Sequence, residues 1–282
     1  MIPILDTHLH LIYQNHFTYK WCKDVPALQS DFNIEEYEQI TSKLGIAKSI
    51  FMEVDVIEAE ISQEASFFAE LAKRNDNNLS GIIASCRPEN ENFSSLLDQT
   101  LSELVCGFRR VLHVMPDALS QSKRFRDNIK VIASHQLPFE LCINQSQHQL
   151  IYDLIHSCPD NQFVLDHCGG PSLILEDYKP WAASLKKIAS LPNVVCKISG
   201  IIAGLPQSSD TDTLNPWIDT TLEFFGADKV MIGSDWPVCN LGRDLPTWVN
   251  HIRTQFSTYS TSEQHKIFHQ NAQSIYQIQN LQ

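Results

Sequence analysis

The stretch QFVLDH at residues 162–167 is a short apolar run that ends in two polar residues. A segment with helical periodicity begins at Trp181, and a second apolar run, NVVCKIS, follows at residues 193–199. Apolar, β-branched runs that alternate with helical segments are typical of βα units around a parallel sheet. This part of the chain therefore predicts two parallel strands joined by a helix.

The same unit recurs along the whole chain. We expect eight strands, each followed by a helical segment, at residues 2–8, 47–54, 81–86, 105–112, 138–143, 162–167, 193–199 and 229–234. Asn33 is placed to cap a helix over residues 34–40, which Gly45 closes, and one more helix is expected at residues 263–278. The pattern predicts an α/β fold, a (β/α)8 barrel of the TIM type with an extra carboxyl-terminal helix, in a single domain over residues 1–282.

A doubly wound sheet is less consistent with the sequence, because no glycine-rich dinucleotide loop follows a predicted strand and Gly169-Gly170 is too short to form one. The 282 residues are 43% hydrophobic, which is enough for a large core. The formal net charge of −12 opposes binding to nucleic acid and to anionic membranes, so neither is an expected partner. No export signal is visible, and the eight cysteines form no C-x-x-C pair, so we expect free thiols and a cytoplasmic location.

Residues that could carry chemistry lie where the predicted strands end. DTHLH, residues 6–10, closes the first strand, and strand alternation would point Asp6, His8 and His10 to the same side. His167 ends the sixth strand, and Asp235 comes just after the eighth. Because the carboxyl ends of barrel strands meet at one mouth, we expect the three histidines and Asp235 to converge there.

Five segments carry a resemblance to a known family, supported by Asn271-Ala272 in the last predicted helix: DTHLH at 6–10, GFRRVL at 107–112, FVLDHCG at 163–169, NVVCKISG at 193–200 and GSDWPVC at 233–239. On these segments the chain resembles the amidohydrolase superfamily. Within it, the similarity is to the amidohydrolase-2 group, which includes fuconolactonase and other sugar lactonases and the 2-pyrone-4,6-dicarboxylate lactonases. The resemblance implies a (β/α)8 barrel in which Asp235 activates a water while His8, His10 and His167 polarise the carbonyl.

The activity expected on these grounds is hydrolysis of a lactone, most simply a sugar lactone in carbohydrate metabolism. Opening a cyclic ester requires a base near the attacking water and stabilisation of the developing oxyanion. Two other enzymes on the same barrel are alternatives: a 2-pyrone-4,6-dicarboxylate lactonase, which would need several arginines at the mouth, and a related decarboxylase. A barrel that binds a small molecule without catalysis is the alternative from another class.

The sequence leaves the role of a metal open. His8, His10 and Asp235 suit a mononuclear site for one divalent ion such as Zn²⁺. Binuclear members of the superfamily need a bridging residue on the fourth strand and commonly a histidine on the fifth, where this chain has LCIN at residues 141–144. The resemblance to lactonases is also compatible with catalysis that is independent of a metal.

Contacts to a small-molecule substrate are predicted around the mouth. They involve residues that follow the second to fifth strands and two tryptophans whose rings could face a sugar: Glu53, Arg87, Arg110, His113, Asn144, Trp21 and Trp236. Lys197 is interpreted as a member of a strand-end ion pair. The other histidines are expected to be surface or packing residues: His16, His135, His148, His156, His251, His265 and His269. The oligomeric state is not predicted.

Overall fold

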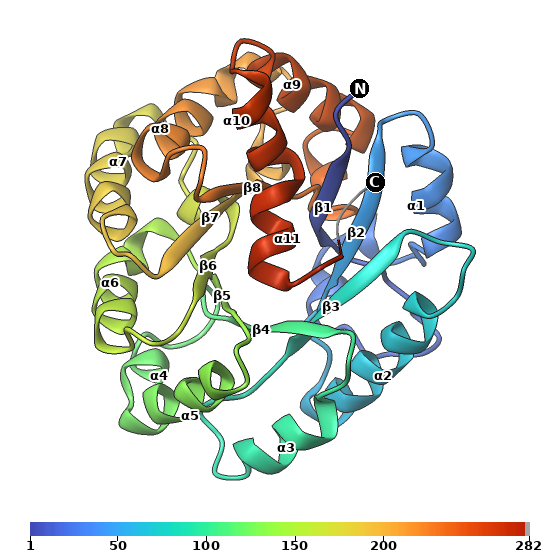
Figure 1. Cartoon of the computed structure of the whole chain (residues 1–282), viewed down its shortest axis with the longest axis vertical. Helices are drawn as coiled ribbons and strands as arrows, with labels where there is room; N and C mark the ends of the chain where they lie inside the picture. The colour runs from blue at the N-terminus through green and yellow to red at the C-terminus, as the bar shows by residue number, and fades with distance from the viewer. Residues whose placement is uncertain (280–282) are drawn as a thin grey trace.

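A computed structural model describes residues 1–279, in which eight parallel strands follow one another in sequence order around a barrel (Figure 1). The strands are β1 (Ile4–Leu9), β2 (Ile46–Met52), β3 (Leu79–Ser85), β4 (Val105–Val111), β5 (Phe139–Cys142), β6 (Phe163–Leu165), β7 (Val194–Ile198) and β8 (Val230–Ile232). Each overlaps one of the eight expected segments. The prediction of a (β/α)8 barrel is confirmed.

The barrel closes between β1 and the residues that follow β8. Leu9 pairs in parallel with Trp236, and the His10 amide donates to the Trp236 carbonyl at 2.8 Å. The Asp235 amide donates to the His8 carbonyl at 2.7 Å. Backbone hydrogen bonds therefore place the end of the first strand directly beside Asp235.

Helices surround the strands (Figure 1). They are α1 (Ile34–Thr41), α2 (Ile61–Ala72), α3 (Phe93–Thr100), α4 (Ala118–Gln121), α5 (Lys123–Ser134), α6 (His148–Ser157), α7 (Leu175–Ala189), α8 (Asn215–Phe225) and α9 (Leu245–Phe256), with α10 (Thr261–His265) and α11 (Asn271–Tyr276) near the carboxyl terminus. The predicted cap on α1 is present, because the Asn33 side chain accepts a hydrogen bond from the Glu36 amide at 2.9 Å. The cap satisfies a backbone donor that the first helical turn leaves free.

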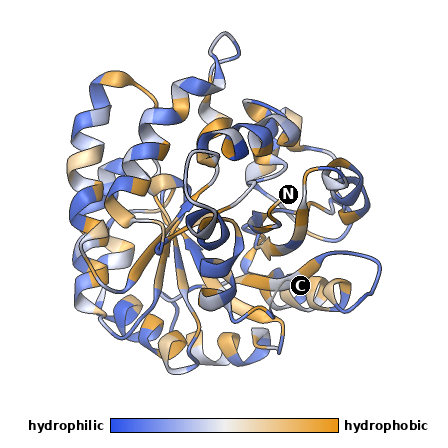
Figure 2. Ribbon diagram, turned by 45° about the horizontal axis from the view of Figure 1, so that its top comes forward, coloured by the Kyte–Doolittle hydropathy of each residue, from blue (hydrophilic) through white to orange (hydrophobic). Residues whose placement is uncertain are grey.

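Apolar side chains pack in two separate layers. The larger layer lies between strands and helices and includes Phe108, Phe163 and Trp217. The smaller fills the barrel interior and includes Leu5 and Val164. The central strands are largely hydrophobic in Figure 2, as expected for a parallel sheet buried on both faces.

The carboxyl-terminal helical segment lies across one end of the barrel (Figure 1). Ala272 and Tyr276 of α11 join the interior cluster, which contains Leu5 near the start of β1 and Met231 near the start of β8. This segment therefore covers the amino-terminal end of the barrel. It begins at Thr261 and ends at Tyr276, close to the expected 263–278, and a π-helical turn at Lys266–Gln270 interrupts it.

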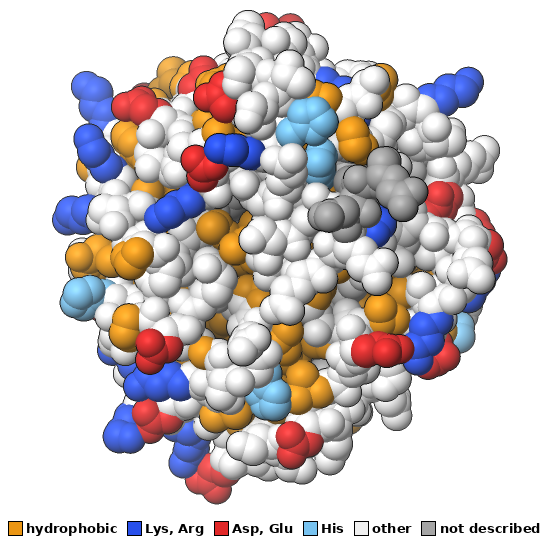
Figure 3. Space-filling model, in the orientation of Figure 1, with side chains coloured by type: hydrophobic (Ala, Val, Ile, Leu, Met, Phe, Trp, Pro, Cys, Tyr) orange, Lys and Arg blue, Asp and Glu red, His pale blue; other side chains and the backbone are white. Residues whose placement is uncertain are grey.

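The surface carries mixed charge. On the face that α11 covers, acidic and basic side chains are interspersed and lie mainly toward the periphery (Figure 3). All eight cysteines are free and buried. Within residues 1–279, no helix combines the length and the apolar character needed to span a membrane.

Stability is expected to fall in mild acid. Burial lowers the pKa of His148, whose ring nitrogens lie 2.7 Å from Ser184 Oγ and 2.6 Å from the Gly169 carbonyl oxygen. Burial also lowers the pKa of His251. The unfolded chain therefore binds protons that the folded chain excludes, so the free energy of unfolding should decrease as the pH falls from about 7 to about 5. Denaturant titrations across this range measure the slope.

The contribution of one histidine can be isolated with a matched pair of variants. His148→Gln cannot titrate, so its stability should depend less steeply on pH than that of the wild type. His156→Gln removes an exposed histidine of the same helix and should leave the slope unchanged. Equal slopes in all three proteins would contradict the assignment to His148.

Candidate active site

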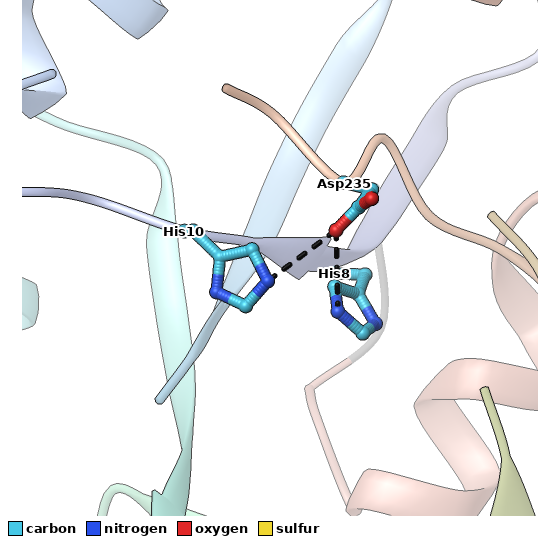
Figure 4. Close-up of side chains that lie close together, drawn as sticks. All are labelled: His8, His10 and Asp235. Carbon is cyan, nitrogen blue, oxygen red and sulfur yellow. Dashed lines mark ion pairs between the residues drawn. The ribbon is translucent and has the colours of Figure 1, made fainter. Parts of the chain in front are cut away.

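Asp235 lies between two histidines at the carboxyl-terminal end of the barrel. Its Oδ1 is 3.3 Å from His10 Nε2 and 3.6 Å from His8 Nε2 (Figure 4). The three residues are nearly inaccessible, with exposed fractions of 4% for Asp235, 0% for His8 and 5% for His10. The two histidines are on the first strand and the carboxylate follows the last, so barrel closure brings them together.

His167 is the fourth member of this group. It begins a 3₁₀ turn after β6, its ring centroid lies 4.5 Å from that of His8, and its Nδ1 is 2.9 Å from Ser199 Oγ. The structure thus brings together the residues that the sequence predicts to be catalytic. Two glycines make this possible: a Cβ on Gly200 would lie 2.2 Å from the His167 ring, and one on Gly233 would lie 2.5 Å from the Cβ of His8.

Asp235 and His167 both have left-handed backbone conformations, with φ of 57° and 54°. Residues other than glycine adopt this region at a cost of about 1–3 kcal/mol, and such strain concentrates at functional sites. The Asp235 backbone is held by the hydrogen bond from its amide to His8. The strained conformation is therefore supported by the same contact that closes the barrel.

The expectation that Asp6 points the same way as His8 and His10 is wrong. A register irregularity between Asp6 and Leu9 interrupts the alternation of side chains on β1. Asp6 accepts hydrogen bonds from the Tyr37 hydroxyl of α1 at 2.7 Å and from the Ser234 amide at 2.8 Å. Its carboxylate therefore holds the outer side of the barrel closure, and it bonds His8 only through the backbone amide, at 3.1 Å.

Two further charged residues contact this group and were not singled out from the sequence. Arg109 Nη1 lies 3.3 Å from His8 Nε2, and Asp166 Oδ1 lies 3.4 Å from His8 Nδ1. Strand alternation could have identified them, because Phe108 packs against the helices and its neighbour Arg109 must face inward. The same argument applies to Asp166, which follows Leu165 of the outer layer.

Electrostatics keep Asp235 ionised within a ring of imidazoles. Burial opposes its ionisation, but the neighbouring imidazoles, His167 first and then His10, lower the pKa of this carboxyl to about 2. Burial opposes the charged form of His167, but Asp235, Cys142 and Asp166 together outweigh it, so the pKa of His167 is raised. Burial lowers the pKa of His8 well below its ordinary value. The arrangement offers a proton acceptor beside groups that can stabilise negative charge.

The donor set fits a divalent metal ion. His10 Nδ1 lies 3.0 Å from the Met52 carbonyl oxygen, which can only accept, so in the neutral ring Nε2 is free of a proton and faces Asp235. Neighbouring ligand atoms of tetrahedral zinc are roughly 3.4 Å apart, given bonds of about 2.0–2.1 Å. The measured separations from Asp235 Oδ1, 3.3 and 3.6 Å, match this value. His8, His10 and Asp235 could therefore hold one ion.

The predicted charged substrate contacts are engaged in ion pairs. Glu53 Oε1 accepts from Arg109 Nε at 2.6 Å, and Arg87 Nη2 lies 3.1 Å from Asp55 Oδ1. Arg110 pairs with Glu89 Oε1 at 2.6 Å. These side chains follow strands that end at the catalytic mouth, and each arginine already has a carboxylate partner.

The remaining predicted contacts have varied surroundings. His113 is exposed, and its Nδ1 lies 3.4 Å from the sulfur of Cys142, which ends β5. Asn144 caps the turn at residues 145–147. The Trp21 indole donates to the Val54 carbonyl at 2.8 Å. Trp236 is fully buried between the rings of Phe32 and Tyr37, so it offers no free face to a sugar.

Fold and site together define the class of protein: a (β/α)8 barrel with a histidine–aspartate group at its catalytic end. The chain belongs to the amidohydrolase family, whose model, described as "Amidohydrolase", matches residues 5–278. An uncharacterised protein of Sinorhizobium fredii is 24% identical over 300 residues, covering 98% of this chain and 99% of the relative.

The relatives whose names state an activity are lactonases. L-fucono-1,5-lactonase of Burkholderia multivorans is 42% identical over 89 residues, which cover 28% of this chain and 30% of that enzyme. L-rhamnono-gamma-lactonase of Scheffersomyces stipitis is 24% identical over 200 residues, or 62% of this chain and 60% of that enzyme. Among solved structures, an amidohydrolase from B. multivorans with bound zinc has a TM-score of 0.89 at 21% identity, covering 98% of this chain and 100% of that one.

Metal analysis should find at most one tightly bound divalent ion per chain. The two groups of described residues that could hold an ion, His8–His10–Asp235 and His8–Asp166–His167, share His8, so they cannot act independently. Replacing the ligand in His10→Gln should weaken zinc binding at least as much as the roughly 10- to 100-fold lost with an outer-shell partner. Competition with a chromophoric chelator measures the affinity.

His113→Gln is the matched control, since it removes a histidine at the same mouth that lies outside both groups. Its zinc affinity should equal that of the wild type. Two tightly held ions per chain, both required for turnover, would rule out the mononuclear site.

Proposed function

We propose that this protein hydrolyses a small neutral lactone, and that its substrate is a sugar lactone. The observation that carries the proposal is the Asp235 carboxylate, held 3.3 Å from His10 and 3.6 Å from His8 at the catalytic end of the barrel. A base flanked by imidazoles meets the requirements of ester hydrolysis. The lactonase names of the two relatives support the substrate class.

In the proposed mechanism, Asp235 takes a proton from a water as the water oxygen attacks the lactone carbonyl carbon. The negative charge that develops on the carbonyl oxygen is stabilised by His167, whose pKa is raised. The ring C–O bond then breaks, and the proton held by Asp235 passes to the ring oxygen. One water is consumed, and the product is an open-chain hydroxy acid. A divalent ion bound by His8, His10 and Asp235 would supply Lewis-acid polarisation.

The ion pairs around the mouth favour a neutral substrate. A dicarboxylate such as the pyrone substrate needs arginines that are free to bind it. Arg87 is paired with Asp55, and Arg110 donates to Glu89 through both Nε and Nη2. These arginines therefore have their charge balanced within the protein. A mouth whose charges are already paired suits an uncharged, polyhydroxylated ring.

The proposal extends to the setting of the enzyme. We place it in carbohydrate metabolism as a cytoplasmic, single-domain hydrolase of a small molecule, without nucleic acid or membrane partners. The net charge of −12 supports the exclusion of polyanionic partners.

The variant Asp235→Asn should lose lactone hydrolysis while keeping its fold. An amide has the size of the carboxylate but cannot accept the proton from water, so kcat should fall by ~10²- to 10⁴-fold. Steady-state kinetics and a thermal melt test the two parts of the expectation. Asp160→Asn, at an exposed position, is the control and should match the wild type. Near-normal kcat in well-folded Asp235→Asn would remove Asp235 as the base and point to a bound hydroxide or to His167.

A substrate screen tests the choice between lactone classes. Aldonolactones and 2-pyrone-4,6-dicarboxylate are compared at equal concentration with a pH-indicator dye, because each ring opening releases a proton. We expect turnover of an aldonolactone and at least tenfold slower turnover of the dicarboxylate, since one misplaced or unpaired charge costs about 1.4 kcal/mol or more. The reverse preference would replace the proposal with the pyrone alternative, and inactivity toward both would contradict lactone hydrolysis.

A further inference from the structure

A chain of polar side chains runs through the barrel interior from the carboxyl-terminal helix toward the active site. The Tyr276 hydroxyl of α11 donates to Glu140 Oε1 at 2.6 Å, and Lys197 Nζ donates to Glu140 Oε2 at 2.6 Å. Lys197 Nζ also donates to the Thr7 carbonyl oxygen at 2.8 Å. Glu140 and Lys197 have no solvent exposure, and Tyr276 is 2% exposed.

The chain continues from Lys197 to the catalytic group. Lys197 Nζ lies 3.7 Å from Asp166 Oδ1, and the same oxygen lies 3.4 Å from His8 Nδ1. Arg109 approaches the other Asp166 oxygen at 3.7 Å. Among the described residues, neither His8 Nδ1 nor the Asp166 oxygens have a fully formed hydrogen bond. The contacts with Lys197 and Arg109 therefore replace the stabilisation that water would give to the Asp166 carboxylate.

These groups are placed where charge is expensive. A carboxylate taken out of water is tolerated only with nearby positive charge or donors, and replacing a buried ion pair by apolar side chains often costs no stability. The interior layer next to these groups is apolar: Val164 lies two residues before Asp166, and Val195 lies two residues before Lys197. If Asp166 and Lys197 only stabilised the fold, valines at both positions would serve equally well. The charged chain ends at His8, which contacts Arg109, Asp166 and Asp235.

We propose that Lys197 is a positioning residue for His8. Its ammonium keeps Asp166 as a fixed acceptor facing His8 Nδ1, so that His8 carries its proton on Nδ1 and presents a proton-free Nε2 toward Asp235. Glu140 and Tyr276 fix the ammonium in turn, which makes α11 a support of the catalytic group. Without the ammonium, the Asp166 carboxylate is no longer held facing His8 Nδ1 and can turn away, so the acceptor that selects this tautomer of the ring is lost.

The tautomer matters to the proposed lactone hydrolysis, and that part of the inference rests on the proposed function. A proton-free Nε2 can accept from Arg109 and face a cation or an attacking water beside Asp235, whereas an Nε2–H would place a hydrogen in the same space. The tautomer itself is a property of the folded chain and can be measured whether or not the protein opens lactones.

The test is the protonation pattern of His8 in protein labelled with ¹⁵N-histidine. Long-range proton–nitrogen correlation spectra distinguish the two tautomers, and the His8 signals are identified by their loss in His8→Gln. In the wild type, as purified and after chelator treatment, we expect Nδ1–H. In Lys197→Met, we expect the Nε2–H tautomer or a mixture, together with a loss of kcat of about 10- to 100-fold, as for other outer-shell partners, and little change in KM.

Two matched controls separate positioning from stability. Lys229 Nζ donates to the Leu191 carbonyl outside this chain of residues, so Lys229→Met should keep the wild-type His8 pattern. Tyr178 bonds the Thr220 hydroxyl at 2.6 Å, so Tyr178→Phe matches Tyr276→Phe as the loss of one tyrosine hydroxyl. Of these two tyrosine variants, Tyr276→Phe should shift the His8 tautomer and Tyr178→Phe should not. The shift in Tyr276→Phe should be smaller than that in Lys197→Met.

If Lys197→Met does not fold because Glu140 is left unpaired, the double variant Lys197→Met/Glu140→Gln removes both charges and takes its place. A folded variant of either kind that keeps His8 as Nδ1–H overturns the positioning role, whatever its activity. A shifted tautomer in a protein that hydrolyses no lactone supports the positioning role and counts only against the proposed function.

Discussion

The closure of the barrel is the constraint on which the site depends. The Asp235 amide bonds the His8 carbonyl at 2.7 Å, and the His10 amide bonds the Trp236 carbonyl at 2.8 Å. These bonds complete the sheet and also set the spacing of the catalytic side chains. Because Asp235 has a positive φ, its strained backbone is retained only while the closure holds it. Fold stability and active-site geometry are therefore two consequences of the same hydrogen bonds.

Charge balance is the second organising feature. At the mouth, Arg109, Arg87 and Arg110 each face a carboxylate, and inside the barrel Lys197 lies between Glu140 and Asp166. Burial raises the pKa of Glu140, and the nearby Lys197 ammonium opposes the rise. Unpaired charges at these depths would cost more than the fold could sustain. Asp235, in contrast, has histidines beside it and no arginine or lysine partner among the described residues.

The sequence predicts the barrel and the meeting of four residues because both follow from periodicity. Eight apolar runs locate the strands, and residues at the ends of parallel strands share a mouth. The orientation of Asp6 could not be predicted, because an irregularity in β1 shifts the side-chain alternation and appears only once β1 pairs with β2. The alternation of side chains along a strand could have predicted that Arg109 and Asp166 face the barrel interior. Their ion pairs, and the burial of Trp236, depend on packing between segments far apart in the chain.

The carboxyl-terminal helix belongs to the catalytic structure for a reason that the strand pattern does not reveal. A (β/α)8 barrel open at its amino-terminal end would expose the interior layer to water. Ala272 and Tyr276 close that end, and the Tyr276 hydroxyl occupies one oxygen of Glu140. Water admitted there would solvate Glu140 and Lys197 and weaken the field that Lys197 exerts on Asp166, since attraction between charges falls steeply as the local dielectric rises. Exclusion of water at one end of the barrel thus supports the arrangement of charges at the other.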